Sequence, residues 1–402
     1  MLSKGTSYMF LKVYEALLCI YIVIAPINNA LNDQGIYAMV GYAAMLLLII
    51  GTFCAWLGGA FGAKRKMGGI FTAIYLVVPL TMAGTLLDLI QYHGAPQVLL
   101  FAQFISLSKR VDLKKMLMAF YVSAIVSALF SLFHGWVDST VSRTAAMVDG
   151  SIAPVVLAIT LFVEEDFEYT KVYKSWKAAG MVGGVIVALF GMSRSRLLLI
   201  ALMLLLKVVL NLTYSVSSGK VGQSTLLLIP LIIVAFVAVT ELDVVKQLVT
   251  EIERRYEGGF ADKVREMEAE AGWTLFKGDW VFGRGWKKIL YKIPAGFQIY
   301  NNHNMYVTIF LRGGVVLAAT MFYSFACMIL QTIRRKNILA FVLLGLVFAL
   351  GYGNAGVFNY TICSMLIPFA ILLDQGEEGT AEEQENSAEE EENDENDLCC
   401  QG

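Results

Sequence analysis

Charged residues are scarce in this sequence, at 16% of 402 residues, against about 25% in an ordinary soluble domain. Prolines number only 7, whereas hydrophobic residues reach 57%. The chain therefore lacks the polar residues that would cover the surface of a soluble protein of this length, which excludes a soluble cytosolic or nuclear enzyme. Its composition is typical of a membrane protein whose apolar helices face the lipid bilayer.

Residue patterns that bind metals and nucleotides are also missing. The chain has 6 cysteines and 3 histidines, and neither type occurs at the spacing of a zinc site. It has no glycine-rich phosphate loop followed by lysine. We therefore expect no metal and no cofactor. The 31 basic residues nearly balance 33 acidic ones, many of which lie at the C-terminal end. The basic remainder suits loops at an anionic lipid surface and requires no nucleic acid as partner.

Long apolar runs recur along the chain. A membrane-spanning helix needs about 20 mostly apolar residues, and we identify roughly twelve candidate segments. The segments are 9–30, 35–57, 67–90, 95–108, 116–136, 151–164, 176–192, 196–216, 224–241, 304–330, 337–353 and 356–373. Two of these, 95–108 and 151–164, are short, so about ten or eleven crossings are the alternative. The sequence predicts an all-α polytopic membrane protein with about 12 transmembrane helices.

The loop charges predict the orientation of these helices. If the N-terminus is cytoplasmic, the clusters of Lys and Arg fall in the inner loops, at 64–66, 109–115, 171–174 and 334–336. The short outer loops at 28–36 and 91–96 contain no Lys or Arg. This distribution follows the positive-inside rule and places both termini in the cytoplasm.

Three regions follow from this topology: a transmembrane bundle over 1–373, a large outer loop inserted at 242–303, and a tail over 374–402. The tail is acidic and almost free of apolar residues, so we expect it to be disordered and cytoplasmic. The outer loop has helical spacing over Val244–Tyr256 and Ala261–Phe276, with glycines between. We expect this loop to fold as a partly helical lid over the outer mouth of the bundle.

His303 is the leading candidate for chemistry. It lies where the outer loop enters an apolar helix, with Asn304 directly after it and Arg312 about two and a half turns further on. An imidazole at this place can act as a general base near neutral pH, an effect of about 10²- to 10⁴-fold in rate. The alternative is a histidine that caps the helix at a wet interface.

Arginines at the outer membrane boundary form a second group of candidates. Arg194 and Arg196 directly precede the apolar run 197–206, where they oppose the positive-inside bias. An anionic ligand would explain them, because guanidinium groups bind phosphate oxygens in pairs and keep their charge. Anchoring of the helix end at the interface is the other explanation.

Further polar side chains fall on the same predicted face. Arg143, Arg265 and Arg284 lie in outer loops, where each alone is explained as a solvated charge. Together they can form an electropositive pocket beside His303 that suits a lipid diphosphate. Asp88, near the outer end of the third predicted span, either orients one of these cations or marks the point where its helix meets water.

These motifs together resemble the bacterial O-antigen ligases, within the wider superfamily of O-antigen ligases and polymerases. Arg194 before a long apolar helix is similar to the Ser/Thr-Arg pattern of the family. Arg265 and the glycines of 281–286 are similar to its large periplasmic loop, and His303-Asn304 to its His-Asn pair. The stretch 86–92 is also similar to enterobacterial ligases, which favours a ligase over a polymerase.

The resemblance implies glycosyl transfer at the periplasmic face of the bacterial inner membrane. The donor would be a polysaccharide on undecaprenyl diphosphate, and the acceptor a sugar hydroxyl of lipid A-core. His303 would take the acceptor's proton while Arg194 and Arg265 hold the diphosphate, with Arg196 competing for the role of Arg194. Transfer would invert the anomeric centre without a metal or cofactor. The supporting residues would be Asp88, Arg143, Arg284, Asn304 and Arg312.

Three alternatives remain at this point. An O-antigen polymerase would use the same donor with a second lipid-linked glycan as acceptor. A transporter or flippase of lipid-linked sugars would have charged or broken helices at mid-membrane and often related halves, whereas the polar residues here gather at one face. A structural partner of an assembly complex would not need His303.

Overall fold

The computed structural model is almost entirely helical, which confirms the all-helical fold class. It describes residues 4–27, 112–137, 140–141, 148–163, 171–191, 194–217, 250, 260–285, 291–292, 298–299, 302–353, 366 and 369–370. Within these ranges, strand is limited to two antiparallel hairpins of two-residue strands. They are β1 (Trp136–Val137) with β2 (Thr140–Val141), and β3 (Tyr291–Lys292) with β4 (Gln298–Ile299).

The helices fall close to the apolar runs of the sequence. They are α1 (Lys4–Ile24, followed by the 3-10 turn η1, Ala25–Ile27), α7 (Leu113–Gly135), α8 (Ile152–Phe162), α9 (Lys171–Gly191), α10 (Arg194–Ser217), α13 (Phe260–Phe276), α14 (Met305–Arg334) and α15 (Ile338–Gly353). The predicted helix over Ala261–Phe276 in the outer loop is confirmed by α13. Its predicted neighbour, Val244–Tyr256, lies outside the described residues apart from Thr250.

Helices α1, α7 and α9 run parallel to one another. Ser123 on α7 donates to the carbonyl of Ile22 on α1 at 2.8 Å. On the other side of α7, Gly183 of α9 faces Ala124, and a Cβ on Gly183 would come within 2.8 Å of the Ala124 carbonyl oxygen. Small residues thus bring the α7 and α9 backbones close together, as is common between helices in membranes.

Helices α8 and α10 run in the opposite direction. The backbone N–H of Asp149, just before α8, donates to Pro26 in η1 at 2.6 Å, and Gly150 contacts Arg196 in the first turn of α10. The end of α1 therefore meets the beginnings of α8 and α10. These are the directions expected if successive predicted spans cross the membrane in alternate directions.

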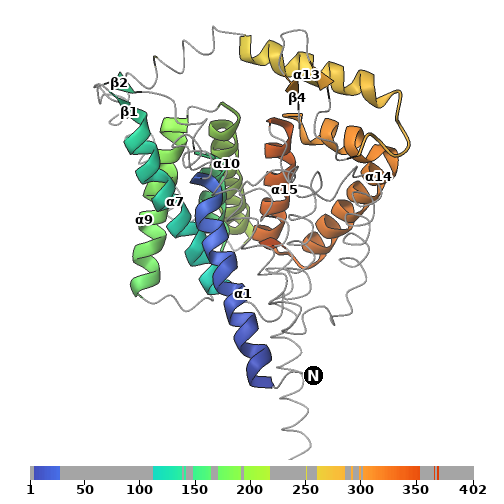
Figure 1. Ribbon diagram of the computed structural model, residues 1–402. Helices are drawn as coiled ribbons and strands as arrows, with labels where there is room; N and C mark the ends of the chain where they lie inside the picture. Colours follow the sequence, from blue (N-terminus) through green and yellow to red (C-terminus); the bar gives the residue numbers. More distant parts are fainter. Residues whose placement is uncertain are drawn as a thin grey trace, which may run out of the picture.

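Helices α14 and α15 form an antiparallel pair. Tyr306 near the start of α14 donates its hydroxyl to the carbonyl of Phe348 near the end of α15, at 2.9 Å. Figure 1 shows α13, β1, β2 and β4 at one end of the molecule and the N-terminus of α1 toward the other. The junction between the outer loop and α14 therefore lies at the end that the topology predicts to be outside.

Among the described residues, Leu113–His134 is long and apolar enough to cross a membrane. The pair Met305–Ala319 and Met321–Arg334 passes the same test when taken together, although its two parts are bent by 62°. Ile152–Phe162 and Ile338–Tyr352 are shorter apolar helices. The described helices thus offer one or two candidate spans, and the other predicted crossings remain predictions.

A break in α14 at Gly314 differs from the single helical span predicted over 304–330. Gly314 leaves helical geometry, with φ of 65° and ψ of −166°, and the loop segment 280–285 lies against this break. Four backbone hydrogen bonds join the two: Val315 N–H to Trp280 at 2.8 Å, Val316 N–H to Val281 at 3.3 Å, Arg284 N–H to Leu311 at 2.7 Å and Gly285 N–H to Arg312 at 2.9 Å.

These hydrogen bonds replace the ones that the break removes. In a continuous helix, the N–H groups of Val315 and Val316 would bond to the carbonyls four residues earlier, which are those of Leu311 and Arg312. The loop supplies a partner to all four groups instead. Irregular backbone is tolerated at membrane depth when protein satisfies it in this way. Backbone hydrogen bonds therefore join the outer loop directly to α14.

Candidate functional site

His303 and Glu268 form a close polar contact between the outer loop and α14. Nδ1 of His303 lies 2.6 Å from Oε2 of Glu268. The Glu268 side chain is only 4% exposed, whereas that of His303 is 56% exposed. A buried carboxylate therefore holds one edge of an imidazole that remains accessible to a ligand.

The backbone on either side of His303 is fixed by neighbouring asparagines. Asn302 is buried and donates its side-chain amide to the backbone carbonyl of Glu268 at 2.8 Å. Asn304 is the N-cap of α14, and its side-chain oxygen accepts from the N–H groups of Tyr306 at 2.9 Å and Val307 at 3.3 Å. Asn304 therefore fixes the start of α14, and its supporting role at the site stays a prediction.

Arg265 shares helix α13 with Glu268. The two residues are three positions apart, a spacing that places their Cβ atoms about 5 to 6 Å apart on neighbouring parts of the helix surface. The Arg265 side chain is exposed. Because Glu268 contacts His303, Arg265 lies about one turn of α13 from the residue that contacts the imidazole. Aromatic contacts of Trp273 and Phe276 with Phe310, at centroid distances of 5.2 and 5.3 Å, also hold α13 on α14.

Arg196 is paired inside the protein. Its Nη2 donates to Oδ1 of Asp149 at 3.1 Å, and the two side chains are 16% and 7% exposed. Gly150 permits this arrangement, because a Cβ there would come within 2.8 Å of the guanidinium. Arg194 begins α10, and its side chain lies outside the described residues. Arg196 is therefore already paired within the protein, and diphosphate binding by Arg194 stays a prediction.

Arg284 and Arg312 also have partners within the protein. Arg312 is fully buried and donates to the carbonyl of Gly285 at 3.0 Å. Nε of Arg284 donates to Oδ2 of Asp279 at 2.8 Å. Both arginines therefore hold the loop segment 280–285, and buried Arg312 cannot contact a ligand at the surface. The other two supporting candidates, Asp88 and Arg143, lie outside the described residues.

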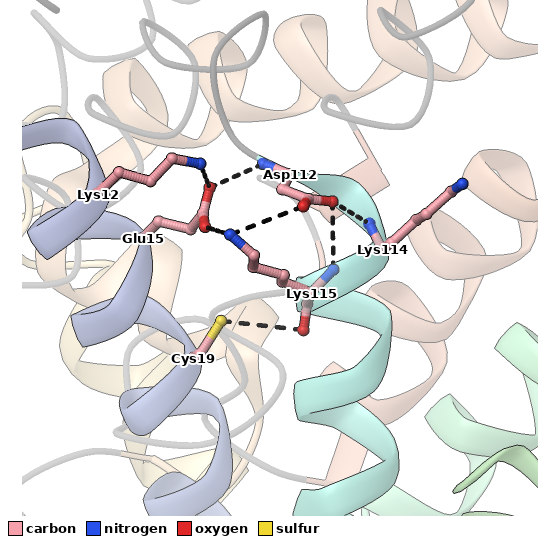
Figure 2. A network of polar contacts seen from close by, with 6 residues as sticks. All are labelled: Lys12, Glu15, Cys19, Asp112, Lys114 and Lys115. Carbon is pink, nitrogen blue, oxygen red and sulfur yellow. Dashed lines mark hydrogen bonds and ion pairs between the residues drawn. The ribbon is translucent and has the colours of Figure 1, made fainter. Parts of the chain in front are cut away.

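A separate charged cluster joins α1 to α7 nearer the other end of these helices (Figure 2). Buried Glu15 accepts from Nζ of Lys115 at 2.5 Å and from the backbone N–H of Asp112 at 3.1 Å. Nζ of Lys12 lies 3.4 Å from the same carboxylate. Glu15 is about 16 Å along α1 from Pro26, so this cluster lies away from the contact between α1 and α8. It neutralises a buried acid within the bundle.

Two of these contacts were not predicted from the sequence. The sequence did not single out Glu268 or Asp149. An acid at helical spacing from Arg265 was the available signal for Glu268, but its contact with His303 depends on how α13 packs on α14. Within the described residues, no group of three His, Cys, Asp or Glu side chains could hold a metal ion.

No protein-family model matches this chain, and no curated protein matches it at a significant level.

Proposed function

We propose that this protein is an O-antigen ligase. It transfers a polysaccharide from undecaprenyl diphosphate to a sugar hydroxyl of lipid A-core, at the periplasmic face of the bacterial inner membrane. The observation that carries this proposal is the contact between Glu268 and His303. This contact joins the candidate base, just before α14, to helix α13, which also carries the cation Arg265.

The proposed reaction is a direct displacement at the anomeric carbon of the donor. The acceptor oxygen bonds to that carbon while its proton passes to Nε2 of His303. The bond between the carbon and the diphosphate oxygen breaks, and undecaprenyl diphosphate leaves with the electron pair. Inversion of the anomeric centre follows, because attack and departure occur on opposite faces.

Cations and the α14 helix terminus would stabilise the leaving group. Arg265 and Arg194 would hold the diphosphate, and a guanidinium directed at developing charge contributes about 10²- to 10³-fold in rate. The N-terminus of α14, at Asn304, adds the positive end of a helix dipole beside His303. The energy for transfer comes from the phosphate ester of the donor itself, which fits the lack of a nucleotide-binding motif in the sequence.

The first test uses cells in which the chromosomal gene is deleted and variants are supplied on a plasmid. We expect the deletion to leave bare lipid A-core on a lipopolysaccharide gel while lipid-linked polymer accumulates. The unmodified gene should restore polymer-bearing lipopolysaccharide, and His303→Ala and Arg265→Ala should fail to do so at equal expression. Lys263→Ala removes an exposed cation from the same helix and should restore it fully.

Two results would contradict the proposal. A deletion strain whose core carries a single repeat unit would indicate a polymerase in place of a ligase. Full restoration by both His303→Ala and Arg265→Ala would show that these residues are not the site.

A further inference from the structure

We propose that Glu268 is the positioning residue that makes Nε2 of His303 the base. This inference rests on the proposed function and assigns a role to a residue outside the motifs that suggested it. Its basis is the 2.6 Å contact between Glu268 Oε2 and His303 Nδ1.

The contact selects one tautomer of the imidazole. A carboxylate can only accept hydrogen bonds, so Nδ1 must carry the proton that lies between the two groups. In neutral His303, the lone pair is then on Nε2. Without Glu268, the ring can hold its proton on either nitrogen and can rotate, and only part of the population would be ready to accept a proton from an acceptor hydroxyl.

The difference in burial between the two side chains supports this division of roles. Glu268 is 4% exposed and His303 is 56% exposed, so water has little access to the carboxylate but free access to the ring. A carboxylate shielded from water interacts more strongly with the imidazolium that forms when Nε2 takes a proton. Glu268 would therefore stabilise His303 at the moment when the ring becomes charged, without touching substrate.

The main chain of Glu268 is also held at the start of α14. Asn302, adjacent to His303, donates to the backbone carbonyl of Glu268 at 2.8 Å, so side chain and main chain of Glu268 both meet the start of α14. The aromatic contacts of Trp273 and Phe276 with Phe310 hold the same helix on α14 further along. With two attachments, α13 presents Glu268 to His303 in one orientation.

A purely structural role for Glu268 makes a different prediction. If the contact served only to fix α13 on α14, its loss would displace Arg265 on the same helix, and donor binding would weaken. If Glu268 orients the base, its loss would slow the chemical step and leave donor binding unchanged. The two roles are therefore separated by whether KM for the donor or kcat changes.

The experiment compares Glu268→Gln with Glu270→Gln in the purified full-length protein. Glu270 is an exposed residue on the same helix, so its variant makes the same chemical change away from His303. Initial rates are measured with undecaprenyl-diphosphate-linked polysaccharide and lipid A-core. We expect Glu268→Gln to lower kcat by on the order of 10²-fold, with the donor KM within about twofold of the unmodified protein. Glu270→Gln should match the unmodified protein in both constants.

The possible results test the role of Glu268 separately from the proposed function. If the unmodified protein is active, His303→Ala is inactive and Glu268→Gln keeps the normal kcat, the role of Glu268 is wrong while the proposed function stands. A rise in donor KM at normal kcat would likewise overturn it in favour of the structural role. If the unmodified protein forms no product, the proposed function fails and the inference with it.

Discussion

The arginines at the outer end of the molecule differ in what surrounds them. Arg196 is paired with Asp149, Arg284 with Asp279, and Arg312 is buried against the carbonyl of Gly285. Arg265 is exposed, one helical turn from the partner of His303. The sequence could not show these pairings, because residue type and predicted side of the membrane do not reveal a partner distant in the chain. Packing thus separates the arginines that hold the fold from one suited to bind a ligand.

Removal of the Arg196 side chain should destabilise the protein. Arg196→Ala leaves the largely buried carboxylate of Asp149 without its cation, and loss of one member of a buried pair removes on the order of 3 kcal/mol of stability. The measurement is thermal unfolding of the purified protein in detergent. The double variant Arg196→Ala, Asp149→Ala should be less destabilised than Arg196→Ala alone, since no unpaired charge remains. An unchanged unfolding temperature in Arg196→Ala would contradict the pairing.

At the level of secondary structure, the outer loop and α14 form one unit. The segment 280–285 supplies hydrogen-bond partners to the four backbone groups released by the break at Gly314. Gly283 and Gly314 both have positive φ, and a Cβ on Gly283 would come within 2.6 Å of the Arg312 carbonyl. Two glycines therefore allow the loop to approach α14 closely enough for these bonds to form.

Replacement of Gly314 should separate the loop from the helix. In Gly314→Ala, the new methyl would overlap the carbonyl of Val281, and positive φ adds about 1 to 2 kcal/mol. We expect a loss of at least about 2 kcal/mol in unfolding free energy. Gly345→Ala in α15 is the matched control, because nothing lies within 4 Å of a Cβ there, and its effect should stay within about 1 kcal/mol. Equal unfolding free energies of Gly314→Ala and Gly345→Ala would contradict the packing of segment 280–285 against α14.

Apolar runs and helical spacing predicted much of the secondary structure. The runs at 116–136 and 337–353 correspond closely to α7 and α15, and spacing predicted α13 within a residue. The break at Gly314 was not predicted, because Gly313 and Gly314 lie in an apolar run. The groups that it releases bond to a distant loop segment, and such contacts leave no periodic signal in either partner.

For the molecule as a whole, the contacts separate two polar regions. The helix ends near Pro26, Asp149 and Arg196 gather at one place, and a network of Glu15 with two lysines joins α1 and α7 further along. Alternating loop charges could predict this arrangement, because Lys and Arg mark the cytoplasmic side. They could not predict the pairing of His303 with Glu268, which depends on the fold of the outer loop. The candidate base was therefore available from the sequence, but its orientation was not.

The most direct measurement of the central claim is transfer by the purified protein reconstituted in lipid vesicles, with chelator present and no nucleotide. The vesicles carry undecaprenyl-diphosphate-linked polysaccharide and lipid A-core. We predict a new glycosidic bond with inverted anomeric configuration, as determined by NMR, and one undecaprenyl diphosphate released for each bond, with both products lost in His303→Ala. Absence of the bond in the unmodified protein, retention of configuration, or undiminished transfer by His303→Ala would contradict the account.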